Sequence, residues 1–200
     1  MSAPHRLLAA TNNPDKLREI KAILNGAGWV LLSLADFPPF PEPEEDGATL
    51  VENAMIKARE GFRQTGLITL ADDTGLEVDA LGGKPGVYSA RFAGEAATYQ
   101  DNVNRLLREL QGIPSEKRTA TFRCVMALVG EGMELWWRGD VQGVILSEPK
   151  GTSGFGYDPV FWCPELDKTF AEATLGEKNR VSHRARALAE LKTQLIELEK

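Results

Sequence analysis

Residues 118–146 read RTATFRCVMALVGEGMELWWRGDVQGVIL, and this stretch decides the fold that we expect. Two long apolar runs, Arg118–Val129 and Met133–Leu146, flank a short break that contains Gly130 and Gly132. Strand-like runs separated by a few residues that include glycine are typical of a β-hairpin. The stretch therefore predicts two long, adjacent strands that run in opposite directions.

Shorter strand patterns alternate with helix patterns along the rest of the chain. Apolar strands are predicted at 7–10, 30–34 and 67–71, and the last is expected to end at Asp72 and Asp73. Helices are expected to begin near Asn13, Thr49, Thr98 and Ser182. This alternation, with one antiparallel pair, predicts an α/β fold with a mixed, mostly long-stranded sheet flanked by helices. A chain of this length is expected to form a single domain, residues 1–200.

The composition excludes several classes of protein. The chain has 200 residues, of which 42% are hydrophobic and 26% are charged, and its net charge is -6. A protein that binds nucleic acid broadly usually carries the opposite charge. No apolar stretch approaches the ~20 residues of a membrane span, and the N-terminal residues lack the apolar core of a signal peptide. We therefore expect a cytoplasmic protein without a membrane segment or a stable nucleic-acid partner.

The first candidate site is the stretch Thr11–Lys16, where a predicted strand runs into a predicted helix. Free backbone N–H groups at a helix N-terminus, together with the helix dipole, favour an anion there. The stretch lacks the glycines and the Lys-Ser/Thr pair of a Walker A motif. Taken alone, it also fits an ordinary capped helix, with Asn13 as the N-cap and Pro14 in the first turn.

Acidic residues in two segments form the second candidate site. One segment is Glu42–Asp46, which borders a proline-rich loop, and the other is Asp72–Asp73, which follows an apolar strand. Ligands of open α/β sheets gather beyond the carboxyl ends of strands. Magnesium needs only a few carboxylates when phosphate oxygens and water complete its shell. One carboxylate from each segment would suffice, and the alternative is a solvated acidic loop with an aspartate-rich turn.

The third candidate site is Gly151–Leu188, which reads GTSGFGYDPVFWCPELDKTFAEATLGEKNRVSHRARAL. Its glycines allow positive φ angles and close approach of the backbone to a ligand. An aromatic ring, Phe155 or Tyr157, can pack on a base, and cations such as Lys178 can reach phosphates. The alternative is a turn followed by a solvated helix start, but a plain loop needs neither so many glycines nor so many cations. The stretch therefore favours binding of a nucleotide.

These sites, taken in order, resemble the inosine/xanthosine triphosphate pyrophosphatase family, also called Ham1-like or noncanonical purine nucleoside triphosphate pyrophosphatases. The resemblance covers nearly the whole chain, and the ordered set of motifs is highly specific. The matching blocks are ATNNPDKLRE (10–19), EDG (45–47), ENA (52–54), KA (57–58), ADDTGL (71–76), LGG (81–83), PG (85–86), YSAR (88–91), GFGYDP (154–159), KTFAE (168–172) and KNRVSHR (178–184). Small departures from the family pattern fall at Asn12, Leu50, Thr74 and Ala185.

The resemblance implies an enzyme that hydrolyses ITP, dITP or XTP to the monophosphate and pyrophosphate, by attack of water on the α-phosphorus. Such an enzyme removes deaminated purines from the nucleotide pool before they enter DNA or RNA. The resemblance also implies magnesium as cofactor, a homodimer, and a Maf/Ham1-like fold of two lobes with a central cleft. The alternatives are a Maf-like pyrophosphatase acting on dTTP or UTP and a nucleotide sensor without activity, which the intact acidic residues disfavour.

Carried over residue by residue, the resemblance assigns Asp73 as the general base. It assigns Glu44 and Asp73 as metal ligands, with the adjacent Glu45 and Asp72 as alternatives. The residues expected to bind substrate are Thr11, Asn12, Asn13, Pro14, Asp15, Lys16, Thr74, Phe155, Gly156, Tyr157, Asp158, Lys178, His183 and Arg184. How the last two divide between base and phosphate stays open. Hydrogen-bond donors that face the O6 oxygen of the purine would discriminate against adenine, because adenine would leave these donors unpaired.

Overall fold

The hairpin expected from residues 118–146 is present in the computed structural model, which describes residues 5–198. Strands β5 (Thr119–Gly130) and β6 (Met133–Ile145) are neighbours in the sheet. They run in opposite directions, because only Glu131 and Gly132 join them. The other strands are β1 (Arg6–Ala9), β2 (Val30–Ser33), β3 (Thr69–Val78), β4 (Pro85–Gly86), β7 (Phe161–Cys163) and β8 (Lys168–Thr169).

The sheet is mixed, as predicted. Its strand order is β2-β1-β3-β5-β6-β7-β8, and β4 pairs with β3. Strand β1 is parallel to both β2 and β3, whereas the pairs β3–β4, β6–β7 and β7–β8 are antiparallel. The described chain divides into two compact units: unit 1 comprises 5–73, 124–139 and 184–198, and unit 2 comprises 74–123 and 140–183. The expectations of a single domain and of a central cleft stay predictions.

The starts of the helices follow the capping residues of the sequence. Asn13 caps α1, and capping boxes at Thr49 and Thr98 start α2 and α3. A further capping box, Thr174 with Glu177, starts α4, which the sequence analysis did not separate from a loop. Residues 5–198 contain the α-helices α1 (Pro14–Leu24), α2 (Leu50–Thr65), α3 (Tyr99–Glu109), α4 (Leu175–Val181) and α5 (His183–Leu198). None of these helices is long and apolar enough to span a bilayer.

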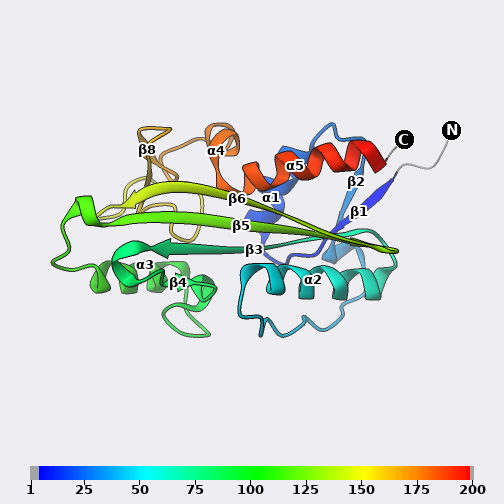
Figure 1. The fold of residues 1–200 in the computed structure, drawn as a ribbon, viewed down its shortest axis with the longest axis horizontal. Coiled ribbons are helices and arrows are strands. Elements are labelled where there is room, and N and C mark those ends of the chain that lie inside the picture. Colours follow the sequence, from blue (N-terminus) through cyan, green and yellow to red (C-terminus); the bar gives the residue numbers. More distant parts are fainter. Residues whose placement is uncertain (1–4, 199–200) are drawn as a thin grey trace. The chain divides into compact units, whose positions relative to one another are not determined.

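Helices cover both faces of the strands of unit 1 (Figure 1). Helices α1 and α5 pack on one face, where they share a core with Leu7 and Leu70. Helix α2 packs on the opposite face, because a Cβ on Gly61 would lie 2.7 Å from Thr69 Cγ2 and 3.3 Å from Leu8 Cδ2. Successive side chains of a strand point to opposite faces, so neighbouring residues of β1 and β3 serve different layers.

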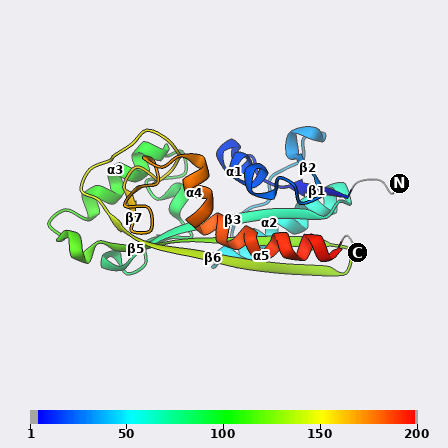
Figure 2. The same ribbon diagram turned by 90° about the horizontal axis from the view of Figure 1, so that it is seen from above.

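Unit 2 has a core of its own, in which aromatic rings pack against α3. The rings of Phe122 and Phe161 lie 4.6 Å apart, and those of Phe161 and Phe170 lie 5.1 Å apart. Val103 and Leu106 of α3 are buried in the same cluster. Figure 2 shows α3, α4 and β7 of this unit. The glycine-rich segment of the third candidate site is therefore anchored on a buried aromatic core.

Strand β3 is longer than the sequence analysis predicts. The sequence pattern predicts an end at Asp72 and Asp73, but β3 continues beyond both of them. Charged side chains inside a strand are costly to bury unless they are paired. Here Lys16 and Arg184 pair with Asp72, and Lys57 pairs with Asp73. The predicted strand end is therefore wrong, because cations from distant segments neutralise the two carboxylates.

Candidate active site

Asp72 lies on the face of β3 that α1 and α5 cover, and it is surrounded by cations. Its Oδ2 atom lies 3.1 Å from Lys16 Nζ and 2.9 Å from Arg184 Nη2. Burial alone would raise the pKa of Asp72, but the attraction of Lys16, Arg184 and Lys57 outweighs burial and lowers this pKa. Asp72 is therefore an ionised carboxylate inside an ion-pair network.

Asp73, the next residue, lies on the opposite face of β3, toward α2. Its Oδ1 atom lies 3.2 Å from Lys57 Nζ, and its Oδ2 atom accepts a hydrogen bond from Asn53 Nδ2 at 3.4 Å. Burial raises the pKa of Asp73, and the attraction of Lys57 and Lys16 opposes this effect only in part. A raised pKa makes Asp73 a stronger proton acceptor than an ordinary aspartate.

Lys57 connects Asp73 to the acidic loop. Its Nζ atom lies 3.1 Å from Glu45 Oε2, so one ammonium serves two carboxylates. Burial would lower the pKa of Lys57, but nearby carboxylates, Asp73 foremost, outweigh burial and raise it. The loop approaches α2 closely at Gly47, whose N–H donates to Asn53 Oδ1 at 2.9 Å. A Cβ at this position would lie 2.6 Å from that oxygen, so the approach requires glycine.

The other acidic side chains of the loop differ in their surroundings. Glu44 is exposed. Glu42 accepts a hydrogen bond from the side-chain amide of Asn12. The acidic loop of unit 1 therefore contacts both the Thr11–Lys16 stretch and the surroundings of Asp73, two segments that are far from each other in sequence.

The Thr11–Lys16 stretch forms a tightly capped helix start. Asn13 Oδ1 accepts hydrogen bonds from the backbone N–H groups of Asp15, at 2.9 Å, and Lys16, at 3.2 Å. Thr11 Oγ1 accepts from the N–H of Asn13 at 3.2 Å. The helix start thus has the ordinary cap that the simpler interpretation predicts. The feature that goes beyond a cap is Lys16, whose ammonium reaches the buried Asp72.

Unit 2 contains a second cluster, built around Asp158. Its Oδ2 atom lies 2.5 Å from Lys178 Nζ and accepts a hydrogen bond from the N–H of Phe155 at 2.8 Å. The ammonium of Lys178 lies 4.8 Å from the centre of the Phe155 ring, a cation–π distance. Gly154 has a φ of 73°, and a Cβ there would lie 2.2 Å from the same carboxylate oxygen. The turn therefore needs glycine at this position.

Two other predicted binding residues are anchored in the core of unit 2. His183 is 2% exposed, and its ring stacks on Phe122 with centroids 4.6 Å apart and planes inclined by 15°. Tyr157 is buried, and its hydroxyl donates to the carbonyl of Ser89 at 2.9 Å. Burial is the main cause that raises the pKa of Tyr157. Of the two rings considered for stacking on a base, the half-buried Phe155 is the more accessible.

The residues around Asp73 fit a metal ion that is shared with a ligand. Within residues 5–198, no three His, Cys, Asp or Glu side chains gather closely enough to hold a metal alone. Asp73 and Glu45, however, both contact the Lys57 ammonium, so the space between these two carboxylates already accommodates a positive charge. Magnesium commonly takes one or two carboxylates together with phosphate oxygens and water. The described residues thus form no cage of protein ligands alone, but they are compatible with a metal ion that phosphate oxygens also bind.

The predicted residues divide between the two units. Unit 1 contains Thr11–Lys16, Glu44, Asp73 and Arg184, and unit 2 contains Thr74, Phe155–Asp158, Lys178 and His183. The side chain of Arg184 is 0% exposed and contacts Glu19 and Asp72. Direct binding of substrate by these residues stays a prediction.

Three residues of the site were missed as functional candidates, namely Asn53, Lys57 and Glu19. Asn53 and Lys57 are four residues apart on α2, and residues at this spacing share a helix face. Glu19 follows Lys16 by three residues on α1, which also places the two on one face. Helical spacing was the signal that would have grouped these side chains with the motifs already chosen.

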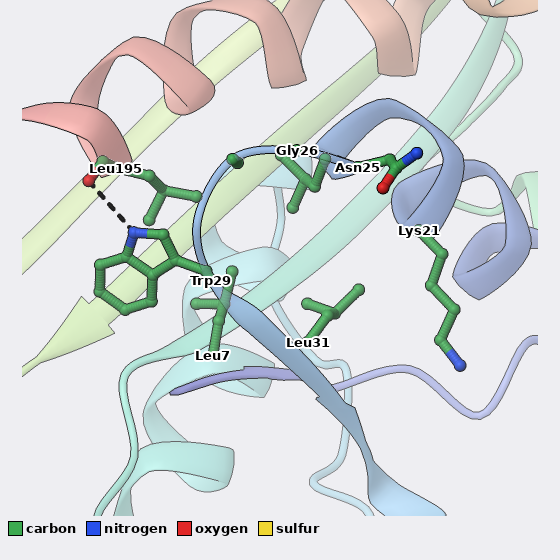
Figure 3. Close-up of a pocket in the computed structure, with 9 residues that line it drawn as sticks. Leu7, Lys21, Asn25, Gly26, Trp29, Leu31 and Leu195 are labelled. Carbon is green, nitrogen blue, oxygen red and sulfur yellow. Dashed lines mark hydrogen bonds between the residues drawn. The ribbon is translucent and has the colours of Figure 1, made fainter. Parts of the chain in front are cut away.

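A cavity of about 170 Å³ lies elsewhere in unit 1, between α1, β2 and the end of α5 (Figure 3). Trp29 forms one side, and its Nε1 atom donates to the carbonyl of Leu195 at 3.2 Å. Lys21 lines the cavity but its ammonium points away from Trp29. No carboxylate lines this cavity, so it lacks the acid–base groups found around Asp73.

Comparison with known proteins identifies the family. The model of the Ham1 family matches residues 7–194, and the chain therefore belongs to this family. A dITP/XTP pyrophosphatase of Geobacter sulfurreducens is 56% identical over 191 residues, which cover 95% of this chain and 96% of the relative. A dITP/XTP pyrophosphatase of Bacillus licheniformis is 50% identical over 190 residues, which cover 94% and 97%.

Solved structures agree with this assignment. A HAM1 protein from Coxiella burnetii has a TM-score of 0.87 at 41% identity, over 96% of this chain and 99% of that one. The Ham1 protein of Staphylococcus aureus has a TM-score of 0.86 at 37% identity, over 98% of this chain and 100% of that one. The predicted family and the predicted fold class are both confirmed.

Proposed function

We propose that the protein hydrolyses ITP, dITP and XTP to the nucleoside monophosphate and pyrophosphate. The observation that carries this proposal is that Lys57 contacts both Asp73 and Glu45, which places a proton acceptor beside a second carboxylate. The chain also belongs to the Ham1 family. The names of the relatives, dITP/XTP pyrophosphatase, support the substrate class. The proposed role is to remove deaminated purine nucleotides from the pool that supplies DNA and RNA synthesis.

The phosphates of the substrate are proposed to bind at the Thr11–Lys16 stretch. A triphosphate carries about four negative charges, and phosphoryl transfer depends mainly on positioning and charge neutralisation. The start of α1 contributes its dipole, and Lys16 contributes an ammonium in the first turn. Lys16 Nζ is 3.1 Å from Asp72, so the lysine is held near β3 before any ligand binds.

Asp73 is the proposed general base. Its raised pKa and its fixed position between Asn53 and Lys57 suit it to take a proton from the water that attacks the α-phosphorus. A divalent metal, which we propose is Mg²⁺, would neutralise phosphate charge when held by Asp73 and either Glu44 or Glu45. Glu45 has its carboxylate on Lys57, whereas Glu44 is exposed and accessible to a ligand from solvent.

The purine base of the substrate is proposed to bind at the glycine-rich turn of unit 2. Phe155 supplies a ring, and Lys178 supplies an ammonium above it. Thr74, the residue after Asp73, supplies a hydroxyl from the opposite face of β3, and His183 has a ring held by its stack on Phe122. A donor aimed at the O6 oxygen of hypoxanthine or xanthine would discriminate strongly against adenine, which carries an amino group there.

We further propose that the protein is a homodimer and acts in the cytoplasm, where nucleotide pools are used.

The test is an assay of purified protein with ITP and MgCl₂ in which pyrophosphate and orthophosphate are measured separately. Stoichiometric release of pyrophosphate is expected, and release of orthophosphate alone, or no turnover, would contradict the proposal. A panel of ITP, dITP, XTP, ATP, GTP, dTTP and UTP should give the highest kcat/KM for the first three. Highest activity on dTTP or UTP would instead indicate a Maf-like specificity, and binding without turnover would indicate a sensor.

A further inference from the structure

We propose that Asn53 is a positioning residue, which orients the carboxylate of Asp73 and ties this orientation to the place of the acidic loop. The proposal rests on the pyrophosphatase function proposed above, in which Asp73 is the general base. Asn53 lies in the ENA block (52–54) that matches the family pattern, but the match assigns it no role. It acts through the two groups that its amide contacts, and not by contact with the substrate.

The side-chain amide of Asn53 joins two segments of unit 1. Its Oδ1 atom accepts a hydrogen bond from the backbone N–H of Gly47 at 2.9 Å, and its Nδ2 atom donates to Asp73 Oδ2 at 3.4 Å. Asn53 is buried, with 1% of its surface exposed. Burial of a polar group is costly unless its hydrogen bonds are made, so both contacts are needed in the folded protein.

Only one orientation of this amide satisfies both of its neighbours. The N–H of Gly47 can only donate, so the oxygen of the amide must face it. The nitrogen then faces Asp73, whose ionised carboxylate can only accept. Rotation of the amide by half a turn would place two donors together at Gly47 and two acceptors together at Asp73. The acidic loop therefore decides which group Asn53 presents to the carboxylate.

Two donors of helix α2 hold the two oxygens of the same carboxylate. Lys57 Nζ lies 3.2 Å from Asp73 Oδ1, while Asn53 faces Oδ2. Residues four apart on a helix share a face, which explains why both side chains reach β3. The χ2 torsion of an aspartate is broad by itself, so a contact at each oxygen fixes the plane of the carboxylate. This plane sets the direction in which a general base meets the proton of the attacking water.

A second asparagine has the same placement on its helix but a different partner. Asn102 in α3 and Asn53 in α2 are each the fourth residue after the N-cap of the helix. Asn102 is 2% exposed, and its amide accepts from the N–H of Ala93 at 2.7 Å and donates to the carbonyl of Ala90 at 2.9 Å. Its amide thus links a helix start to backbone groups, whereas that of Asn53 ends on the proposed general base. The pair separates the structural value of such an amide from its effect on Asp73.

The first experiment measures kcat and KM for ITP, at saturating MgCl₂, in Asn53→Leu and Asn53→Asp. Both variants lose the donor to Asp73, but Asn53→Asp retains an oxygen for the N–H of Gly47. We expect kcat to fall about tenfold or more in both, because small misplacements of catalytic groups are costly, while KM changes less than about threefold. A similar loss in both variants shows that the missing donor, and not the added charge, is the cause. Parental kcat in folded Asn53→Leu overturns the proposal.

The matched control is Asn102→Leu, which removes an amide of similar burial and placement. Its Tm should fall about as much as that of Asn53→Leu, because each substitution leaves two buried polar groups unpaired. Its kcat should stay within about twofold of the parent below the melting transition, because Asn102 shares no partner with Asp73. An equal loss of kcat in the control would overturn the proposal. So would failure of both Asn53 variants to fold, which would assign this residue to stability alone.

The second experiment tests the link between the acidic loop and Asp73. In Gly47→Ala the new methyl group crowds Asn53 Oδ1 at 2.6 Å, so the loop contact is disturbed while the amide remains. We expect kcat to fall in this variant. The double variant with Asn53→Leu should lie less than about twofold below the more impaired single variant, because both substitutions act through one amide. Fully additive losses, or parental kcat in Gly47→Ala, would overturn the proposal.

Two further measurements do not depend on turnover. Hydrogen exchange of the Gly47 amide should be faster than in the parent in Asn53→Leu and should stay slow in Asn53→Asp, which keeps the acceptor. Calorimetry with MnCl₂ and inorganic pyrophosphate should show binding about tenfold weaker in Asn53→Leu, because a residue that orients a metal ligand contributes to metal affinity. If the parent does not hydrolyse ITP, the proposed function fails, and these two measurements still decide the role of Asn53. Unchanged exchange or unchanged metal binding in Asn53→Leu overturns that role.

Discussion

The Lys57 ammonium lies 3.2 Å from Asp73 Oδ1, and this contact links helix α2 to the centre of strand β3. The same ammonium lies 3.1 Å from Glu45, so it fixes Asp73, the proposed general base, and the acidic loop together. A charge-assisted contact of this kind holds both partners more strongly than a neutral hydrogen bond. Lys57 therefore sets the distance between two carboxylates that would otherwise repel each other.

Substitution Lys57→Met should lower kcat for ITP by at least about tenfold, because Asp73 and Glu45 lose their common anchor. Steady-state kinetics with pyrophosphate detection measures the effect. The control Arg59→Gln removes a cation from the same helix that faces Glu134, and it should leave kcat nearly unchanged. Parental kcat in Lys57→Met would remove this lysine from the site.

Substitution Asp73→Asn should reduce turnover by about 10²–10⁴-fold, the usual contribution of a general base. The variant should still bind ITP, because Lys16 and the start of α1 are unchanged. Pyrophosphate release and equilibrium binding, measured on the same preparation, separate the two effects. Full activity in this variant would exclude Asp73 as the base.

The glutamate that binds the metal can be identified from magnesium titrations of Glu44→Gln and Glu45→Gln. The ligand should be the residue whose loss raises the concentration of Mg²⁺ needed for half-maximal activity by about tenfold or more. Loss of Glu45 should also free Lys57 from one of its two carboxylates. An unchanged magnesium requirement in both variants would show that neither glutamate is a ligand.

Substitution Gly154→Ala should destabilise unit 2. A non-glycine residue at a φ of 73° carries strain of about 1–3 kcal/mol, and the new methyl group would also crowd Asp158 Oδ2 at 2.2 Å. The matched control is Gly176→Ala in helix α4, where a Cβ meets nothing within 4 Å. Alanine is favoured over glycine in a helix by about 0.5–1 kcal/mol, so the control should be slightly stabilising. Urea unfolding of both variants provides the free energies, and equal effects would contradict the prediction.

The lowered pKa of Glu177 predicts a loss of stability in acid. Hydrogen bonds from the backbone N–H of Thr174, at 2.8 Å, and from Lys168, at 3.0 Å, lower the pKa of Glu177 to about 2 from its ordinary value of 4.5. Because the folded-state pKa is depressed, the stabilisation is complete above pH 4.5 and is lost as the pH falls toward 2. The Tm difference between the parent and Glu177→Gln should therefore shrink over this interval. A constant difference would contradict this account.

Features that depend on neighbouring residues were predictable from the sequence. The caps at Asn13, Thr49 and Thr98 require only a suitable side chain and the correct spacing, and all three helices begin where the sequence places them. The hairpin of β5 and β6 is equally local, because its turn has two residues. These features need no knowledge of the tertiary fold.

Features that depend on distant partners were not predictable. Arg184 is 112 residues away from Asp72, and no local pattern reveals that they form a buried pair. For this reason the sequence pattern placed the end of β3 too early and did not reveal the buried contacts of Arg184. The division of Asp72 and Asp73 between the two faces of β3 became visible only when the strand could be followed through Asp73.

The alternation of Asp72 and Asp73 along β3 limits how this strand can change in evolution. Because side chains of a strand alternate, insertion or deletion of one residue within it would exchange the faces of all residues beyond that point. Asp72 would then meet α2, and Asp73 would meet the arginine and lysine of the other face. Single-residue changes of length in this strand should therefore be selected against far more strongly than substitutions, and alignments of functional homologues should contain no gap between Thr69 and Asp73.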